Sequence, residues 1–173
     1  CVIKDSAGGL IISRSNINPT AVATATESNL LPNGSFENVT GTAPDNWTLS
    51  EWNVGANVVD STTQKHGKYS MKFVSTGSGG ATATNTALLP ISPSTKYSLL
   101  FSTKSSVADV RNVVEILWYK ADSSASATAS TSLYDDSTTN PTSWTEKAYE
   151  TTSPSDAFYC KVKLTGCHSS DAT

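Results

Sequence analysis

Short runs in which apolar and polar residues alternate recur along most of the chain, and clusters rich in Gly, Pro, Asn, Ser and Thr separate them. Successive side chains of a β-strand point to opposite faces, so a period of two predicts strands with one buried face. No run has the 3.6-residue period of a helix. The spacing predicts an all-β jelly-roll β-sandwich of two antiparallel sheets. The runs lie at 29–37, 54–60, 68–75, 84–89, 95–104, 111–120, 143–151 and 157–165.

Three of these runs indicate which side chains face the core. In each, apolar side chains occupy every second position and form one continuous face. The predicted inward positions are Tyr97, Leu99 and Phe101, then Val114, Ile116 and Trp118, and then Phe158, Cys160, Val162 and Leu164. Glu115 and Tyr119 fall on the opposite face of their run, and Lys161 lies beside Tyr159 opposite Cys160.

Two segments lack this pattern. Residues 1–28 begin with a predicted hairpin over 2–12 and continue as a stretch rich in Ala, Thr, Asn and Ser, which predicts a hairpin and a linker or stalk before a domain at 29–173. So short a hairpin needs a partner surface or another chain to be stable. Residues 122–132 are almost all Ser, Ala and Thr and predict a long exposed loop.

Charge and hydropathy exclude two classes of partner. The net charge is −3 and the basic residues are dispersed, so no basic patch indicates binding to nucleic acid. No apolar run approaches the roughly 20 residues that a membrane-spanning helix needs, so we expect no membrane insertion.

The residues that carry most enzyme chemistry are scarce. The two histidines, His66 and His168, lie in no recognisable nucleophile or metal motif. Asp135 and Asp136 are adjacent, whereas a glycosidase places two acids on separate elements across a cleft. We interpret this pair as part of a solvated turn and expect no catalytic activity.

The three cysteines, Cys1, Cys160 and Cys167, have no zinc-like spacing. Cys160 alternates with apolar residues, which predicts a small buried side chain. A Cys160–Cys167 bridge across a short loop is the alternative.

Five short motifs appear in one order along the chain. The segment 29–37 is NLLPNGSFE and 44–47 is PDNW; 66–73 is HGKYSMKF, 93–99 is PSTKYSL, and 143–145 is SWT. In this order they resemble carbohydrate-binding modules of families four, nine and twenty-two, which are galactose-binding-like jelly rolls. The resemblance spans 29–165. It implies a glycan-binding fold and places Trp47, Tyr97 and Trp144 in the core.

The resemblance also implies a structural Ca²⁺ beside the first strand. The Glu37 carboxylate and carbonyls around Ser35, Lys65 and Lys68 would supply oxygen ligands, which Ca²⁺ prefers. The alternative is that Glu37 only accepts hydrogen bonds from a neighbouring turn.

Glycan sites combine aromatic platforms with side chains that hydrogen-bond sugar hydroxyls. Trp118 alternates with core residues and is assigned to packing. Trp52, flanked by Glu51 and Asn53, is the best candidate for an exposed platform. The predicted ligand-binding residues are Trp52, Glu115, Tyr119, Tyr134, Tyr159 and Lys161.

The C-terminal region departs from the family pattern. Family members close with one more strand after a segment like 164–171, and here Thr173 ends the sequence. Either that strand lies outside this sequence, or another segment or chain supplies it. An unfilled place would leave an open sheet edge, suited to self-association or docking of another chain.

Two functions follow. The first is a non-catalytic glycan-binding module of an extracellular, cell-surface or virion protein, with a polysaccharide or surface glycan as partner. The second is a structural or receptor-binding domain of a phage tail or head fibre, or of another extracellular assembly.

Overall fold

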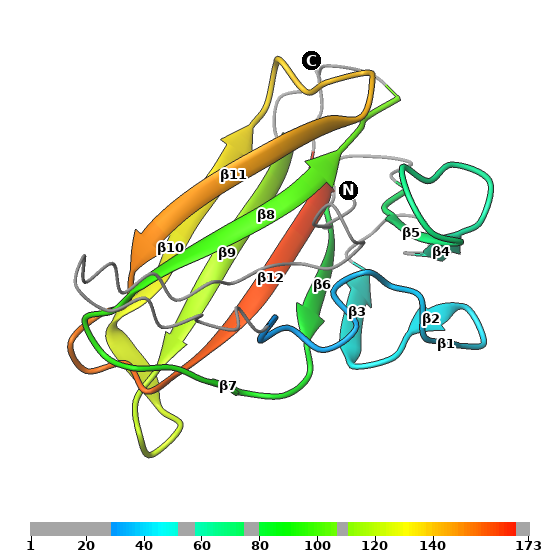
Figure 1. The fold of residues 1–173 in the computed structure, drawn as a ribbon. Helices are drawn as coiled ribbons and strands as arrows, with labels where there is room; N and C mark the ends of the chain where they lie inside the picture. Colours follow the sequence, from blue (N-terminus) through cyan, green and yellow to red (C-terminus); the bar gives the residue numbers. More distant parts are fainter. Residues whose placement is uncertain (1–28, 52–57, 75–79, 107–110, 169–173) are drawn as a thin grey trace, which may run out of the picture.

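The computed structural model describes residues 29–51, 58–74, 80–106 and 111–168 (Figure 1). Within these ranges the chain forms β-strands and no helix, so the described part contains no helix able to cross a membrane. The strands are β1 (Val39–Thr40), β2 (Ala43–Pro44), β3 (Trp47–Glu51), β4 (Val58–Asp60), β5 (Ser70–Lys72), β6 (Ala81–Asn85), β7 (Leu89–Pro90), β8 (Lys96–Thr103), β9 (Arg111–Tyr119), β10 (Ala125–Asp136), β11 (Thr145–Thr152) and β12 (Tyr159–His168).

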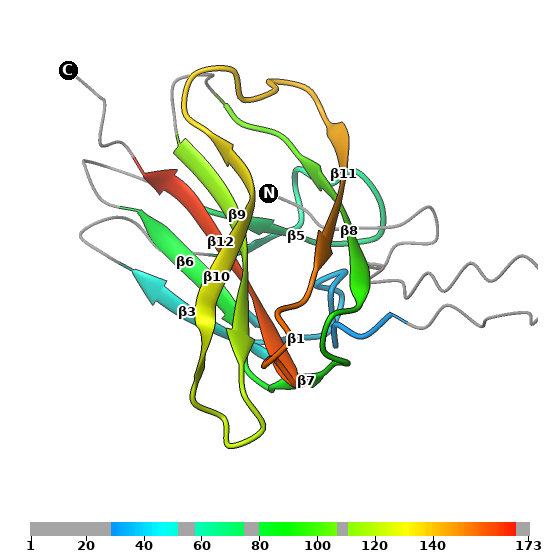
Figure 2. The ribbon, with the colours of Figure 1, turned by 90° about the vertical axis from the view of Figure 1, so that its left-hand side faces the viewer.

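The strands form two layers. The larger sheet has the order β10-β9-β12-β6-β3, and β7 pairs with the beginning of β12. Strands β11 and β8 pair with each other in the opposite layer, and β4–β5 and β1–β2 form two short ladders. Every pairing is antiparallel. Figure 2 shows the larger sheet on one side and β8 with β11 on the other, which confirms the predicted β-sandwich.

The core lies between the two layers and uses the alternate positions that the sequence indicates. Nine inward side chains of β8, β9 and β12 are at most 4% exposed: Tyr97, Leu99, Phe101, Val114, Ile116, Trp118, Cys160, Val162 and Leu164. Trp47 is also buried, and its ring centroid lies 5.2 Å from that of Phe36. Trp118 satisfies its indole N–H by donating to Thr131 Oγ1 at 2.8 Å, as a buried polar group requires.

The strand predicted over 29–37 is wrong. This segment forms a turn, and Asn33 and Phe36 have positive φ angles of 49° and 63°. The Asn33 amide donates to the carbonyls of Asn38 and Asp45, both at 2.8 Å, while its side-chain oxygen accepts from Asn38 N–H. Such side-chain to backbone bonds offer the chain an alternative to a sheet ladder.

The loop predicted over 122–132 is also wrong, because β10 begins at Ala125 and pairs with β9 at the edge of the larger sheet. Of its twelve residues only Ser126 and Tyr134 are buried, so little hydrophobic alternation marks it as a strand.

The predicted alternation fails at Phe158, whose side chain is 45% exposed. The strand begins one residue later, at Tyr159, so the inward direction of Cys160 does not extend to Phe158. Cys160 is a free, buried thiol, and burial raises its pKa to about 12. The alternative of a Cys160–Cys167 bridge is therefore wrong.

Gly166 of β12 allows the β5 segment to pack against the larger sheet. The Phe73 ring lies where a Gly166 side chain would project, and a Cβ there would be 2.5 Å from Phe73 Cγ. Only glycine permits this close approach. Residues 1–28 and Trp52, for which the sequence predicts a stalk and a glycan platform, lie outside the described residues.

Candidate functional site

The outer face of the larger sheet gathers four of the six predicted ligand-binding residues. In the register of β9 with β12, Tyr119 lies opposite Tyr159, Leu117 opposite Lys161, and Glu115 opposite Lys163. All six side chains are partly exposed, because the alternate positions between them fill the core. Facing pairs in an antiparallel ladder lie close enough to bind one ligand together. We call these six side chains the tyrosine face.

Ion pairs hold the charged groups of this face in place. Lys163 Nζ lies 3.0 Å from Glu115 Oε2 across the two strands. Beside them, Arg111 makes a bidentate pair with Asp135 of β10, with distances of 2.7 and 2.6 Å. The hydrogen bonds and positive charge of Arg111 hold the pKa of Asp135 below its usual value. These groups therefore present oriented donors and acceptors at neutral pH.

A shallow hollow of about 340 Å³ lies at this end of the tyrosine face. Its lining combines charged, hydroxyl and apolar side chains: Arg111, Val113, Glu115, Ser132, Asp135 and Thr165. Tyr119 lies four residues along β9 from Glu115, or roughly 14 Å at the rise of a β-strand. The hollow and the tyrosine pair thus lie along one line, long enough for an extended ligand.

Several polar groups on the tyrosine face remain available to a ligand. Within the described ranges, the hydroxyls of Tyr119 and Tyr159 and the Lys161 ammonium make no hydrogen bond or ion pair with the protein. Hydroxyl side chains extend this outer face across β6 and β3, because Lys163 lies opposite Thr84 and Thr84 lies opposite Thr48. The face therefore offers aromatic surface flanked by hydrogen-bonding groups.

Tyr134 does not belong to this face, and its prediction as a glycan platform is wrong. It lies opposite inward-facing Val114, and its side chain is 5% exposed. Its ring contacts Phe101 at a centroid distance of 5.7 Å, and its hydroxyl lies 3.1 Å from Asn140 Oδ1. Burial raises the pKa of Tyr134 strongly. The loop predicted over 122–132 covers most of β10, so alternation does not predict which face of the sheet Tyr134 lies on.

Sequence reasoning missed two charged contributors to this region. Arg111 occupies an alternate position of β9 and therefore lies on the same face as Glu115 and Tyr119. The alternation in 111–120 could have predicted that Arg111 contributes to this face. Asp135 was assigned to a solvated turn, and only the register of β10 places it opposite Val113, on the outer face. Its neighbour Asp136 does serve a turn, since its carboxylate accepts the backbone N–H groups of Thr138 and Thr139.

The predicted metal ligands lie around a different turn. The Glu37 carboxylate accepts the backbone N–H of Lys68 at 2.9 Å and of Tyr69 at 3.3 Å. The Lys65 ammonium donates to Glu146 and Ser102, and these contacts do not involve the Lys65 carbonyl, which is the predicted ligand atom. Across the described residues, no group of three or more His, Cys, Asp or Glu side chains could hold a metal ion. The contacts of Glu37 match its alternative as an acceptor for the turn, and a Ca²⁺ ion bound through carbonyls stays a prediction.

Comparison with known proteins places this geometry in a family. The family model described as carbohydrate binding domain matches residues 28–170. No curated protein matches the chain. Among solved structures, the enzymatically active domain of bacteriophage CBA120 tailspike protein 4 is similar, with a TM-score of 0.58 and 19% sequence identity. The match covers 80% of this chain and 19% of that one, and at this identity it shows the fold alone.

Proposed function

Because the chain belongs to the carbohydrate binding domain family, we propose that it is a non-catalytic module that binds an extended glycan on the tyrosine face. Sugars present apolar C–H surfaces and a rim of hydroxyls, so their sites pair aromatic rings with fixed polar groups. The proposed setting is the surface of a cell or virion, where the partner is a polysaccharide or a surface glycan.

The observation that carries the proposal is the pairing of Tyr119 with Tyr159 on neighbouring strands. Two facing tyrosines can contact one sugar ring or two successive rings, and their hydroxyls and Lys161 remain free to donate hydrogen bonds. Ion-paired Glu115 and Lys163 lie further along the same strands. Their orientation is fixed before a ligand arrives, which reduces the entropy lost on binding.

The carboxyl groups support a binding role rather than hydrolysis. A glycosidase needs one carboxylic acid whose pKa is raised so that it can donate a proton. Where a shift is resolved for a carboxyl group of the described residues, the pKa is lowered. These groups are Asp60, Asp122, Asp135, Asp136, Glu146 and Asp156.

A glycan array tests the proposal, followed by titration of any glycan that binds. Replacing Tyr119 or Tyr159 by Ala should weaken binding about tenfold or more, since a central aromatic contact commonly contributes over 1.4 kcal/mol. Tyr69→Ala is the control, because Tyr69 is also partly buried but lies outside the tyrosine face. If Tyr69→Ala weakens binding as much as Tyr119→Ala, the glycan does not bind on this face. Trp52→Ala tests the remaining predicted platform.

The second function, a structural or receptor-binding domain of a phage fibre, gives a different result. The similar solved structure comes from a phage tailspike, which makes this setting worth testing. A purely structural domain would bind no glycan on the array and would instead self-associate or bind a protein partner. That outcome, with a folded protein, would replace the glycan proposal.

A further inference from the structure

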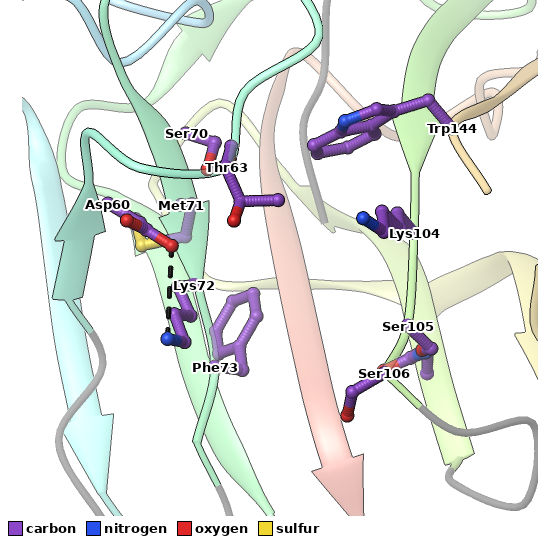
Figure 3. A pocket seen from close by; sticks show the side chains of 11 residues that line it. Asp60, Thr63, Ser70, Met71, Lys72, Phe73, Lys104, Ser105, Ser106 and Trp144 are labelled. Atoms are coloured by element: carbon purple, nitrogen blue, oxygen red, sulfur yellow. Dashed lines mark hydrogen bonds and ion pairs between the residues drawn. The ribbon is translucent and has the colours of Figure 1, made fainter. Parts of the chain in front are cut away.

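A pocket that shares no residue with the tyrosine face opens between the end of β8 and the β5 segment. The ladder of β8 with β11 ends where Thr103 lies opposite Thr145. The next residues beyond it, Lys104 and Trp144, therefore lie side by side, and in Figure 3 their side chains point across the pocket toward Thr63. The volume is about 290 Å³. Because small-molecule sites begin at about 300 Å³, the pocket suits a single ring rather than a long chain.

The charged side chains give the pocket an excess of positive charge. Among the described residues that line it, the charged ones are Lys72, Lys104 and Asp60. Hydrogen bonds from Thr62 hold the pKa of Asp60 below its usual value, so Asp60 is ionised and neutralises Lys72, which lies 3.8 Å away. Lys104 is exposed and makes no hydrogen bond or ion pair within the described ranges. Lys104 is therefore the cation with which an anionic ligand can pair.

An aromatic wall and further hydrogen-bonding groups lie beside this cation. Trp144, which the family resemblance places in the core, is instead partly exposed, and its indole N–H has no acceptor in the described part of the chain. Phe73 is 9% exposed and forms an inner apolar wall. The hydroxyls of Thr63 and Ser106 also have no partner among the described residues. A matching ligand has an apolar ring face, hydroxyl groups around it and one negative charge.

Backbone and side-chain hydrogen bonds fix both sides of the pocket. On one side, the Ser105 N–H next to Lys104 donates to the Pro141 carbonyl at 2.8 Å. On the other side, Ser70 Oγ donates to the Thr63 carbonyl at 2.7 Å. The backbone that carries the unpaired groups is thus held before a ligand arrives, which reduces the entropy lost on binding.

We propose that this pocket binds an acidic sugar, meaning a pyranose ring that carries a carboxylate, such as a glucuronic acid residue at the end of a glycan. The carboxylate pairs with Lys104, and the apolar face of the ring packs on Trp144. The ring hydroxyls bond to Thr63 and Ser106. An inorganic anion would leave the aromatic wall uncovered, and a neutral sugar would leave Lys104 unpaired. This site has its own ligand class and does not depend on glycan binding at the tyrosine face.

NMR titrations of the isotope-labelled full chain test this assignment, with glucuronic acid, glucose and inorganic phosphate as separate probes. We expect glucuronic acid to cause saturable shifts of the Trp144 indole signal and of the Lys104 and Ser105 amide signals. Glucose should bind about fivefold more weakly, because it lacks the charge that pairs with exposed Lys104. Phosphate should leave the Trp144 indole signal unchanged.

Substitutions separate the two parts of the site. Lys104→Gln should lower the affinity for glucuronic acid about fivefold and leave the affinity for glucose unchanged. Lys96→Gln is the matched control, because Lys96 is an exposed lysine at the other end of β8 that pairs with Glu150. Trp144→Ala should weaken the binding of both sugars about tenfold. Trp144→Phe keeps an aromatic wall and should have a smaller effect, which preserves the test if the alanine variant does not fold.

Several results would overturn the proposal. Equal affinities for glucuronic acid and glucose would mean that the pocket does not recognise the carboxylate, and equal losses in Lys104→Gln and Lys96→Gln would indicate an effect of overall charge. Phosphate that shifts the Trp144 indole as strongly would reduce the site to a simple anion site. If glucuronic acid shifts the Tyr119 and Tyr159 signals and not those of the pocket, the acidic sugar binds to the tyrosine face, which would support the proposed function and refute this second site.

Discussion

Gly166→Ala gives a direct test of the packing between β12 and the β5 segment. A Cβ at Gly166 would lie 2.5 Å from Phe73 Cγ and 2.7 Å from both Phe73 Cβ and Cδ2. Carbon atoms in good contact are about 3.5–4.0 Å apart, so the overlap is roughly 1 Å against a buried ring. Phe73 is 9% exposed and cannot move into solvent without losing its own burial.

Two opposing contributions set the size of the effect. Overpacking of this kind costs about 1–3 kcal/mol, whereas replacing glycine by alanine reduces the entropy of the unfolded chain and stabilises by about 0.4–1 kcal/mol. We therefore expect Gly166→Ala to lower the free energy of unfolding by about 1–2 kcal/mol. Urea denaturation followed by tryptophan fluorescence can measure this, because Trp47 and Trp118 are buried and will report loss of the core.

A second substitution isolates the clash. In a Phe73→Ala background the space beside Gly166 is open, so Gly166→Ala should become neutral or stabilising by up to about 1 kcal/mol. Gly41→Ala is the control: nothing lies within 4 Å of its Cβ position, but its φ of 66° strains an alanine. Its cost should be the same with or without Phe73. If Gly166→Ala stabilises the wild-type background as much as the Phe73→Ala background, the packing argument is refuted.

Three further predictions concern ionisable side chains. Cys160 should resist alkylation in the native protein at pH 8 and react on unfolding, because burial raises its pKa to about 12; peptide mass spectrometry separates it from Cys1 and Cys167. Hydrogen bonds to Asp60, Asp135 and Asp136 outweigh burial and lower their pKa values, so their stabilising contribution is complete above about pH 5 and is lost as pH falls below about 4. In acid titrations monitored by circular dichroism, Asp136→Asn should reduce this loss. Glu37→Gln should destabilise the fold by about 1 kcal/mol in a chelator, measured by urea denaturation. A bound Ca²⁺ would add a calcium-dependent rise in Tm that only the wild type shows.

Alternation predicted the core well because a buried face imposes a strict period of two. Val114, Ile116 and Trp118 could be assigned inward from sequence alone, and each is 1% exposed. The segment at Asn33 shows where the method fails, since its apolar neighbours suggested a strand but the Asn33 side chain bonds the backbone of a turn. The prediction misses strand β10 for the opposite reason. Its Ser and Thr residues pair through their backbone at the edge of the sheet, and this pairing needs no hydrophobic alternation.

The sequence could predict the residues that each strand contributes to the tyrosine face, but not that the two strands lie side by side. Because alternate residues of a strand share a face, the sequence of 111–120 predicts that Glu115 and Tyr119 lie together. In the same way, the sequence of 157–165 predicts that Tyr159 and Lys161 lie together. Neither pattern shows which strands are neighbours in the sheet. That information comes from the pairing of β9 with β12, two strands separated by β10 and β11 in the chain. A shift of two residues in this register would leave each strand's own buried face intact, yet Tyr119 would no longer lie opposite Tyr159. The candidate site is therefore a property of the strand pairing, and substitutions that disturb this register should abolish glycan binding before they unfold the sandwich.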